Sequence, residues 1–205
     1  MQKFIRSFSY TFHPLFIPVY ATLFYFFVAQ NYFYKHEIFL IFIQVLILTI
    51  LLPISLFYLL KSLGLIQSKI LLDKKERRLP LTFYALLLFM LIKYSFSTFV
   101  IPELYYYFLG TLISTMLALT LVLFGHKASL HMMAVATLTV FVVSISAYYH
   151  TSFLYVIAAL IVCGGFVASA RLQAKAHTFS ELALGALVGI LPQVCLWYVW
   201  LLPSV

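Results

Sequence analysis

Charged side chains are scarce in this chain of 205 residues: they make up 9% of it, against 65% for hydrophobic residues. Soluble domains carry about 25% charged residues, so this composition excludes a soluble protein and indicates one that lies in a lipid bilayer. There are only two cysteines, Cys163 and Cys195, and both fall inside apolar runs. This placement is typical of small core residues and favours neither a disulfide nor a cysteine metal site.

What the chain has in place of charge is long apolar runs, continuous rather than alternating, which favours helices over strands. The first run follows the basic residues Lys3 and Arg6, contains Pro14 and Pro18 and lacks a small-residue cleavage site, so we interpret it as a retained helix. The sequence therefore predicts an all-α, polytopic membrane helix bundle forming one integral membrane domain over residues 1–205. We expect about seven (six to seven) transmembrane helices, over 9–30, 38–60, 81–101, 104–124, 131–149, 151–170 and 181–202.

The basic residues gather on one side of the predicted membrane. If the N-terminus is cytoplasmic, eleven of the thirteen lysines and arginines fall on the cytoplasmic side, six of them in loop 61–80, whereas Lys35 falls outside. Because cytoplasmic loops carry an excess of Lys and Arg, this asymmetry predicts a cytoplasmic N-terminus. We expect an integral protein of the bacterial cytoplasmic (inner) membrane, whose positive charge meets anionic lipid and lipid phosphate rather than nucleic acid.

Three polar stretches interrupt the apolar background, at 61–80, 126–131 and 171–181. Two predicted spans separate the first from the second, and two more separate the second from the third. Since an even number of crossings returns the chain to the same side, all three stretches are predicted to meet at one membrane surface, whichever way the protein faces.

The third stretch holds the densest group of ionisable residues, Arg171, Lys175, His177 and Glu181. Such groups are costly in or beside hydrocarbon and therefore indicate a site. His177 and Glu181 are four positions apart, which on a helix places them on one face. A carboxylate there can accept the proton of one imidazole nitrogen and leave the other nitrogen free to attack or to take a proton. Arg171 can clamp two oxygens of a phosphate or carboxylate.

The spacing of Arg171, His177 and Glu181 resembles the third signature of the type 2 phosphatidic acid phosphatase (PAP2) superfamily, Ser-Arg-x5-His-x3-Asp. Ala170 stands in place of the serine, and glutamate in place of the aspartate. Glutamate keeps the charge and adds a methylene group.

The second and first stretches also resemble PAP2 signatures. Ser129 and His131 keep their positions in Pro-Ser-Gly-His, with Ala128 and Leu130 at the other two places, and backbone amides opening the next helix there could bind an anion. Residues 73–80 loosely resemble Lys-x6-Arg-Pro, and either of two adjacent arginines could take the arginine position.

The resemblance implies a PAP2-like helical core and a metal-independent phosphatase that needs no cofactor. It implies that His177, aligned by Glu181, attacks phosphorus to form a phosphohistidine, and that His131 protonates the departing lipid oxygen and then activates water. The residues that it implies for holding the phosphoryl oxygens are Arg171, Ser129 and Arg77 or Arg78, with Lys74, Lys75 or Lys127 as helpers.

Two other functions remain open at this point. One is a catalytically inactive, PAP2-like protein that binds lipid phosphates, and the other is phosphoryl transfer from a lipid donor to an acceptor other than water. The basic residues of loop 61–80 also have a simpler interpretation as a topology signal. Polyprenyl diphosphates, phosphatidate-like lipids and phosphorylated saccharolipids all fit a basic pocket at a bilayer surface.

Overall fold

The computed structural model describes residues 2–66, 75–96 and 98–203, and every regular element in these ranges is helical. Short single turns, η1 (Gln30–Tyr32), η2 (Ile47–Leu51) and η3 (Lys75–Arg77), lie between some of the helices. The helices are α1 (Gln2–Thr11), α2 (Ile17–Ala29), α3 (Lys35–Leu46), α4 (Leu52–Ser62), α5 (Arg78–Ser95), α6 (Pro102–Leu123), α7 (Leu130–Tyr148), α8 (Leu154–Gln173) and α9 (Phe179–Trp200).

Six helices in the described ranges are long and apolar enough to cross a membrane. Their bounds lie within a few residues of six predicted spans, except that α5 ends at Ser95, before the predicted end at 101. The all-α architecture and the integral membrane class are therefore confirmed. The six are Lys35–Ser62, Arg78–Ser95, Pro102–Leu123, Leu130–Tyr148, Leu154–Gln173 and Phe179–Trp200.

The predicted span over 9–30 is not one continuous helix, because the chain breaks there into α1 and α2. Pro14 accounts for the break, since a proline disfavours helical geometry in the residue before it. Pro18 is tolerated because it lies in the first turn of α2, where no intrahelical partner is lost. With 13 residues, α2 is about 20 Å long, which is too short to cross a hydrocarbon core of about 30 Å by itself.

The first long helix, Lys35–Ser62, contains a π-helical turn over Ile47–Leu51. Pro53 follows this turn and has no N–H to donate to a carbonyl four residues earlier, so the wider turn relieves a gap in the hydrogen-bond ladder. Only 11% of the residues in its most apolar window are buried in the protein. This helix therefore presents most of its surface to the lipid.

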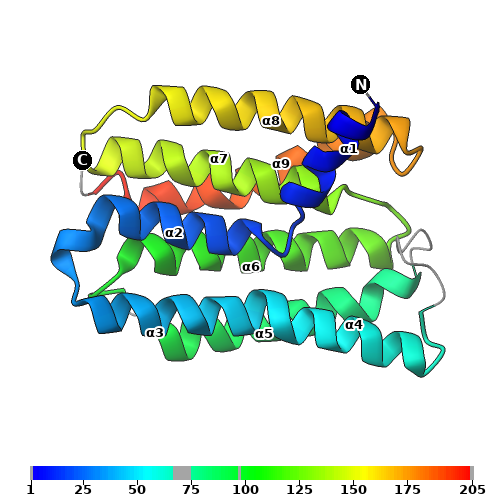
Figure 1. The fold of residues 1–205 in the computed structure, drawn as a ribbon, viewed down its shortest axis with the longest axis horizontal. Coiled ribbons are helices and arrows are strands. Elements are labelled where there is room, and N and C mark those ends of the chain that lie inside the picture. The colour runs from blue at the N-terminus through cyan, green and yellow to red at the C-terminus, as the bar shows by residue number, and fades with distance from the viewer. Residues whose placement is uncertain (1, 67–74, 97, 204–205) are drawn as a thin grey trace.

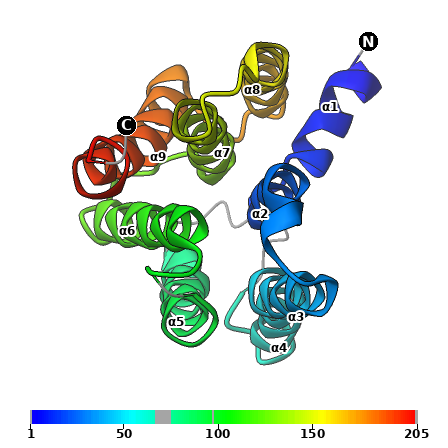
Figure 2. The same cartoon turned by 90° about the vertical axis from the view of Figure 1, so that its left-hand side faces the viewer.

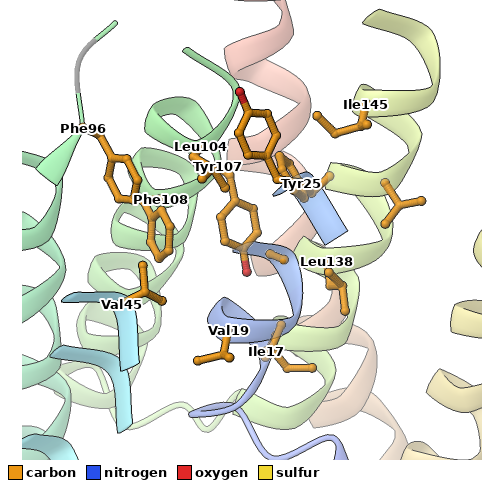
Figure 3. Packing of buried hydrophobic residues seen from close by; sticks show 14 of the residues in the cluster. Ile17, Val19, Tyr25, Val45, Phe96, Leu104, Tyr107, Phe108, Leu138 and Ile145 are labelled. Atoms are coloured by element: carbon orange, nitrogen blue, oxygen red, sulfur yellow. The ribbon is translucent and has the colours of Figure 1, made fainter. Parts of the chain in front are cut away.

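The core lies where α2, α6 and α7 meet, with α5 packed on the outer side of α6 (Figures 1 and 2). Large aromatic side chains fill it, among them Tyr25, Tyr107 and Phe108, which are almost fully buried (Figure 3). The pair α7 and α9 is the most closely packed in the bundle. A Cβ atom added at Gly185 or Gly189 would clash with the backbone of α7 or the residue before it, so this pair of glycines permits the approach.

All three connections that carry the polar stretches lie at one end of the bundle. In Figure 1 the end of α4 and the start of α5 lie at the right-hand end, together with the connections from α6 to α7 and from α8 to α9, whereas the connections from α2 to α3 and from α7 to α8 lie at the left. The prediction that the three stretches share one end is thus confirmed, and this end holds the candidate site.

Candidate functional site

Hydrogen bonds join the three polar stretches directly. The Arg77 guanidinium donates from Nη1 to the carbonyl oxygen of Ala128 at 3.3 Å, which links the start of α5 to the α6–α7 connection. The Lys127 ammonium donates to the carbonyl oxygen of Ala176 at 2.8 Å, which links that connection to the one between α8 and α9. Two cations therefore hold together the loops that surround His177.

The link between α8 and α9 has a strained turn and a strong cap. α8 ends at Gln173, and Lys175 adopts a left-handed conformation with φ of 51°, which costs energy for a residue with a side chain. α9 then begins with a capping box: the Thr178 hydroxyl accepts from the Glu181 amide, and the Glu181 carboxylate accepts from the Thr178 amide. The cap fixes where the Glu181 side chain lies.

His177 precedes this cap and points at the same carboxylate. Its Nδ1 lies 2.8 Å from Glu181 Oε2, and its side chain is 2% exposed. Since an ionised carboxylate can only accept, Nδ1 carries the proton and Nε2 keeps its lone pair. Burial lowers the pKa of His177 to about 4; the Glu181 hydrogen bond opposes this shift, and the positive charges of Lys127 and Arg77 add to it. At neutral pH the imidazole is therefore neutral and nucleophilic.

Ser129 ties the start of α7 to the start of α9. Its hydroxyl caps α7 by accepting from the Met132 amide at 3.5 Å, and its own amide donates to the carbonyl oxygen of Glu181 at 3.0 Å. The side chain is fully buried. Because the Ser129 amide already has this partner, it does not serve as the anion-binding amide that the sequence suggested, and its clear contribution is to set α7 against α9.

His131 and Arg171 form the part of the cluster that α1 covers. Nε2 of His131 lies 3.2 Å from the carbonyl oxygen of Ser9, so this nitrogen carries a proton. Arg171 donates from Nη1 to the Ser9 hydroxyl at 3.3 Å. The Nε of Arg171 is buried and has no hydrogen-bond partner within the described residues. A half-buried guanidinium with an unused, buried donor is suited to receive an anion.

No feature of the sequence pointed to Ser9 or His13 as part of the site. The His13 ring lies 5.2 Å from that of His131, centroid to centroid, in an edge-on arrangement. Burial lowers the pKa of His13, and the positive charge of Arg171 lowers it further. Both residues are more than 110 positions from His131, and no motif or periodicity connects such distant segments, so only the fold could reveal them.

The two adjacent arginines of the first stretch differ in placement. Arg77 is 5% exposed and points inward, whereas Arg78 begins α5 with an exposed side chain. This difference selects Arg77 as the arginine of the cluster. Lys74, which the sequence put forward as a helper, lies outside the described residues, as does the side chain of Lys75.

A cleft of about 360 Å³ opens beside the buried histidine. Its charged lining comes from both sides of the α8–α9 turn and from the α6–α7 connection. The residues that line it are Lys127, Leu172, Lys175, Ala176, His177, Thr178 and Glu181. A ligand in this cleft meets two ammonium groups and the edge of the His177–Glu181 pair.

The fold thus defines an integral membrane protein built from long apolar helices, with a basic, histidine-containing site at one end. No protein-family model, no curated protein and no solved structure matches the chain. The function must therefore be argued from the chemistry of the site.

Proposed function

We propose that the protein is a membrane lipid phosphatase with a PAP2-like core, which hydrolyses a phosphate monoester or diphosphate on a lipid through a phosphohistidine. One observation carries the proposal: a neutral His177, oriented by Glu181 at 2.8 Å, lies among cations at the end of a bundle of membrane-length helices. Phosphoryl transfer through a covalent intermediate needs a nucleophile, a base that orients it and positive charge around it.

In the first step, the lone pair on Nε2 of His177 attacks phosphorus and a P–N bond forms. The bond between phosphorus and the lipid oxygen breaks, and this oxygen takes a proton from the protonated imidazole of His131. The Glu181 carboxylate stabilises the positive charge that develops on the attacking ring, because Nδ1–H already points at it. The products are a lipid alcohol, or a lipid monophosphate from a diphosphate, and the phosphohistidine.

In the second step, water attacks the phosphorus of the phosphohistidine. Neutral His131 takes a proton from this water, the P–N bond breaks, and inorganic phosphate leaves. The His177 lone pair is restored and His131 is again protonated, so the cycle closes without any further reactant.

Arg171, Arg77 and Lys127 are the groups that would neutralise the phosphoryl oxygens. Each carries a positive charge at the end of the bundle that holds His177, and the unused Nε–H of Arg171 offers a donor for an oxygen. Fixed cations are worth most against the charge that grows in the transition state. Ser129 acts in this scheme by holding the helix start that carries His131, and Arg78 takes no part.

The position of the cluster favours lipid substrates. It lies at helix ends, where a head group would sit while its apolar tail stays among the helices or in the bilayer. By the charge asymmetry of the sequence, this end faces the cytoplasm of a bacterium.

The test is phosphate release from a panel of lipid phosphates by purified protein in detergent, with products identified by mass spectrometry. We expect His177→Ala to lower release by at least about 10³-fold, since the nucleophile is lost. His131→Ala should lower it by about 10²- to 10⁴-fold. His126→Ala is the matched control, because this histidine lies at the same end of the bundle but is exposed, and it should leave release unchanged.

Other outcomes would assign a different function. Release by His177→Ala at the wild-type rate would contradict the proposed nucleophile. Binding of lipid phosphates without release would favour a lipid-phosphate-binding protein, and release that depends on an added alcohol acceptor would favour a phosphotransferase.

A further inference from the structure

The helix α1 covers the half of the site that holds His131 and Arg171. One residue of α1 makes both contacts: the Ser9 carbonyl oxygen accepts from His131, and the Ser9 hydroxyl accepts from Arg171. Ser9 is only 9% exposed, although it lies in the terminal helix of the chain. The two side chains that would serve the leaving group and the phosphoryl oxygens are thus both engaged by a segment outside the three polar stretches.

Ser9 gives His131 and Arg171 acceptor oxygens, as a phosphoryl group would, but its oxygens are weaker acceptors. Its carbonyl and hydroxyl oxygens are neutral acceptors, whereas phosphoryl oxygens are charged and make stronger hydrogen bonds to a guanidinium. Ser9 also leaves the buried Nε of Arg171 without a partner. An anion that engages Arg171 through two donors would therefore replace the Ser9 contact with a more favourable one.

The open cleft gives access to His177 and to the lysines beside it. Lys127, Lys175 and His177 are among its lining residues, and neither His131 nor Arg171 lines it in the described part of the chain. A phosphoryl group bound in the cleft can contact His177. It reaches His131 only if α1 moves away from His131 and Arg171.

The attachment of α1 is suited to such a movement. The helix α1 packs against α8, and the ring of Phe8 lies 4.7 Å from the ring of Phe166, centroid to centroid. A non-helical turn over residues 12–16, which contains Pro14, separates it from α2. Figure 1 shows α1 lying obliquely to the long helices over the right-hand part of the bundle, and Figure 2 shows it at the periphery. Because this turn separates the two helices, α1 can move away from α8 without unwinding α2.

We propose that α1 is a gate over the half of the site that holds His131 and Arg171, a gate which Ser9 closes when no phosphate is present and which opens when a phosphorylated ligand engages Arg171. This inference rests on the proposed function for the identity of the ligand. The closed contact itself rests on the geometry of Ser9 alone.

The closed state is tested with single cysteines in a background in which Cys163 and Cys195 are replaced by alanine. Ser9→Cys is nearly isosteric, and Tyr10→Cys on the same helix is the control, because Tyr10 is 69% exposed. In detergent without phosphate, we expect a maleimide to modify the cysteine at position 9 at least about tenfold more slowly than the one at position 10. Equal rates would overturn the gate.

The opening is tested with inorganic phosphate and with a phosphorylated lipid that the protein hydrolyses, each compared with the dephosphorylated lipid. The phosphorylated ligands should raise the modification rate at position 9 severalfold and leave that at position 10 unchanged. If the lipid is hydrolysed but the rate at position 9 stays the same at saturation, the gate is wrong and the proposed function stands.

A third arm needs no ligand. Adding Phe8→Ala to the Ser9→Cys protein removes the ring that packs on Phe166, so we expect modification at position 9 to become about tenfold faster. No acceleration would mean that α1 is not held as a gate. If no lipid phosphate is hydrolysed, the proposed function fails, and the gate is then decided by this arm and by inorganic phosphate.

Discussion

At the scale of single residues, Glu181 shows how one side chain serves two purposes. Its Oε2 accepts from the Thr178 amide, which caps α9, and from His177 Nδ1, which orients the imidazole. The sequence predicted the His177–Glu181 pair from helical spacing, but His177 lies before the helix begins. The pair forms because the capping box turns the Glu181 side chain back toward the residues that precede α9, which a glutamate has the length to do.

The two adjacent arginines provide a test at this scale. Arg77→Ala removes a buried guanidinium near the nucleophile, so we expect kcat/KM for phosphate release to fall by about 10²- to 10³-fold. Arg78→Ala should lower it by less than about fivefold, because an exposed charge contributes little. Thermal unfolding of both variants separates loss of chemistry from loss of fold. Equal losses of activity would contradict the assignment of Arg77 to the site.

At the scale of elements, the placement of α7 against α9 sets the distance between the two histidine-bearing segments. Gly185 lies against the backbone of Ser129, and Gly189 lies against that of Met133, with no room for a Cβ atom at either position. The Ser129 amide completes the junction by donating to the Glu181 carbonyl oxygen. Close packing between backbones therefore brings the start of α7, with His131, next to the start of α9.

We expect Gly185→Ala to destabilise the protein by about 1–3 kcal/mol, because the added methyl group forces α7 and α9 apart. Phosphate release should fall with it, since Ser129 and the helix start that bears His131 move. Gly165→Ala is the control: the same substitution in α8 meets nothing within 4 Å. Thermal unfolding in detergent measures both variants, and equal midpoints would contradict the role of Gly185.

At the scale of the whole molecule, the bundle has one polar end and one end without the three stretches. At the polar end, Arg77 donates a hydrogen bond to the Ala128 carbonyl oxygen and Lys127 donates one to that of Ala176, next to His177. At the opposite end, Glu103 at the start of α6 is 3% exposed and accepts from the hydroxyls of Tyr25 and Tyr149, which ties α2, α6 and α7 together there. The polar end therefore carries the candidate site, whereas the opposite end carries contacts that hold the helices together.

The orientation of the molecule in the membrane can be tested with two exposed positions, His126 at the polar end and Thr151 at the other. In the cysteine-free background, we expect His126→Cys to react with a membrane-impermeant maleimide only after bacterial cells are broken. Thr151→Cys should react in intact cells, because the excess of basic residues predicts a cytoplasmic polar end. Reversed labelling would contradict the orientation, and labelling of both from one side would contradict the crossing of α7.

The sequence by itself determined the membrane class, six of the spans and the shared end of the three polar stretches, because run length and the parity of crossings do not depend on how helices pack. It did not reveal that the run over 9–30 forms two helices rather than one, because Pro14 breaks a run that is apolar enough to continue. The tertiary structure decided that Arg77 rather than Arg78 points inward, and that Ser9 covers His131 and Arg171. These contacts join segments more than 50 residues apart, and only the packing of the helices brings such segments together.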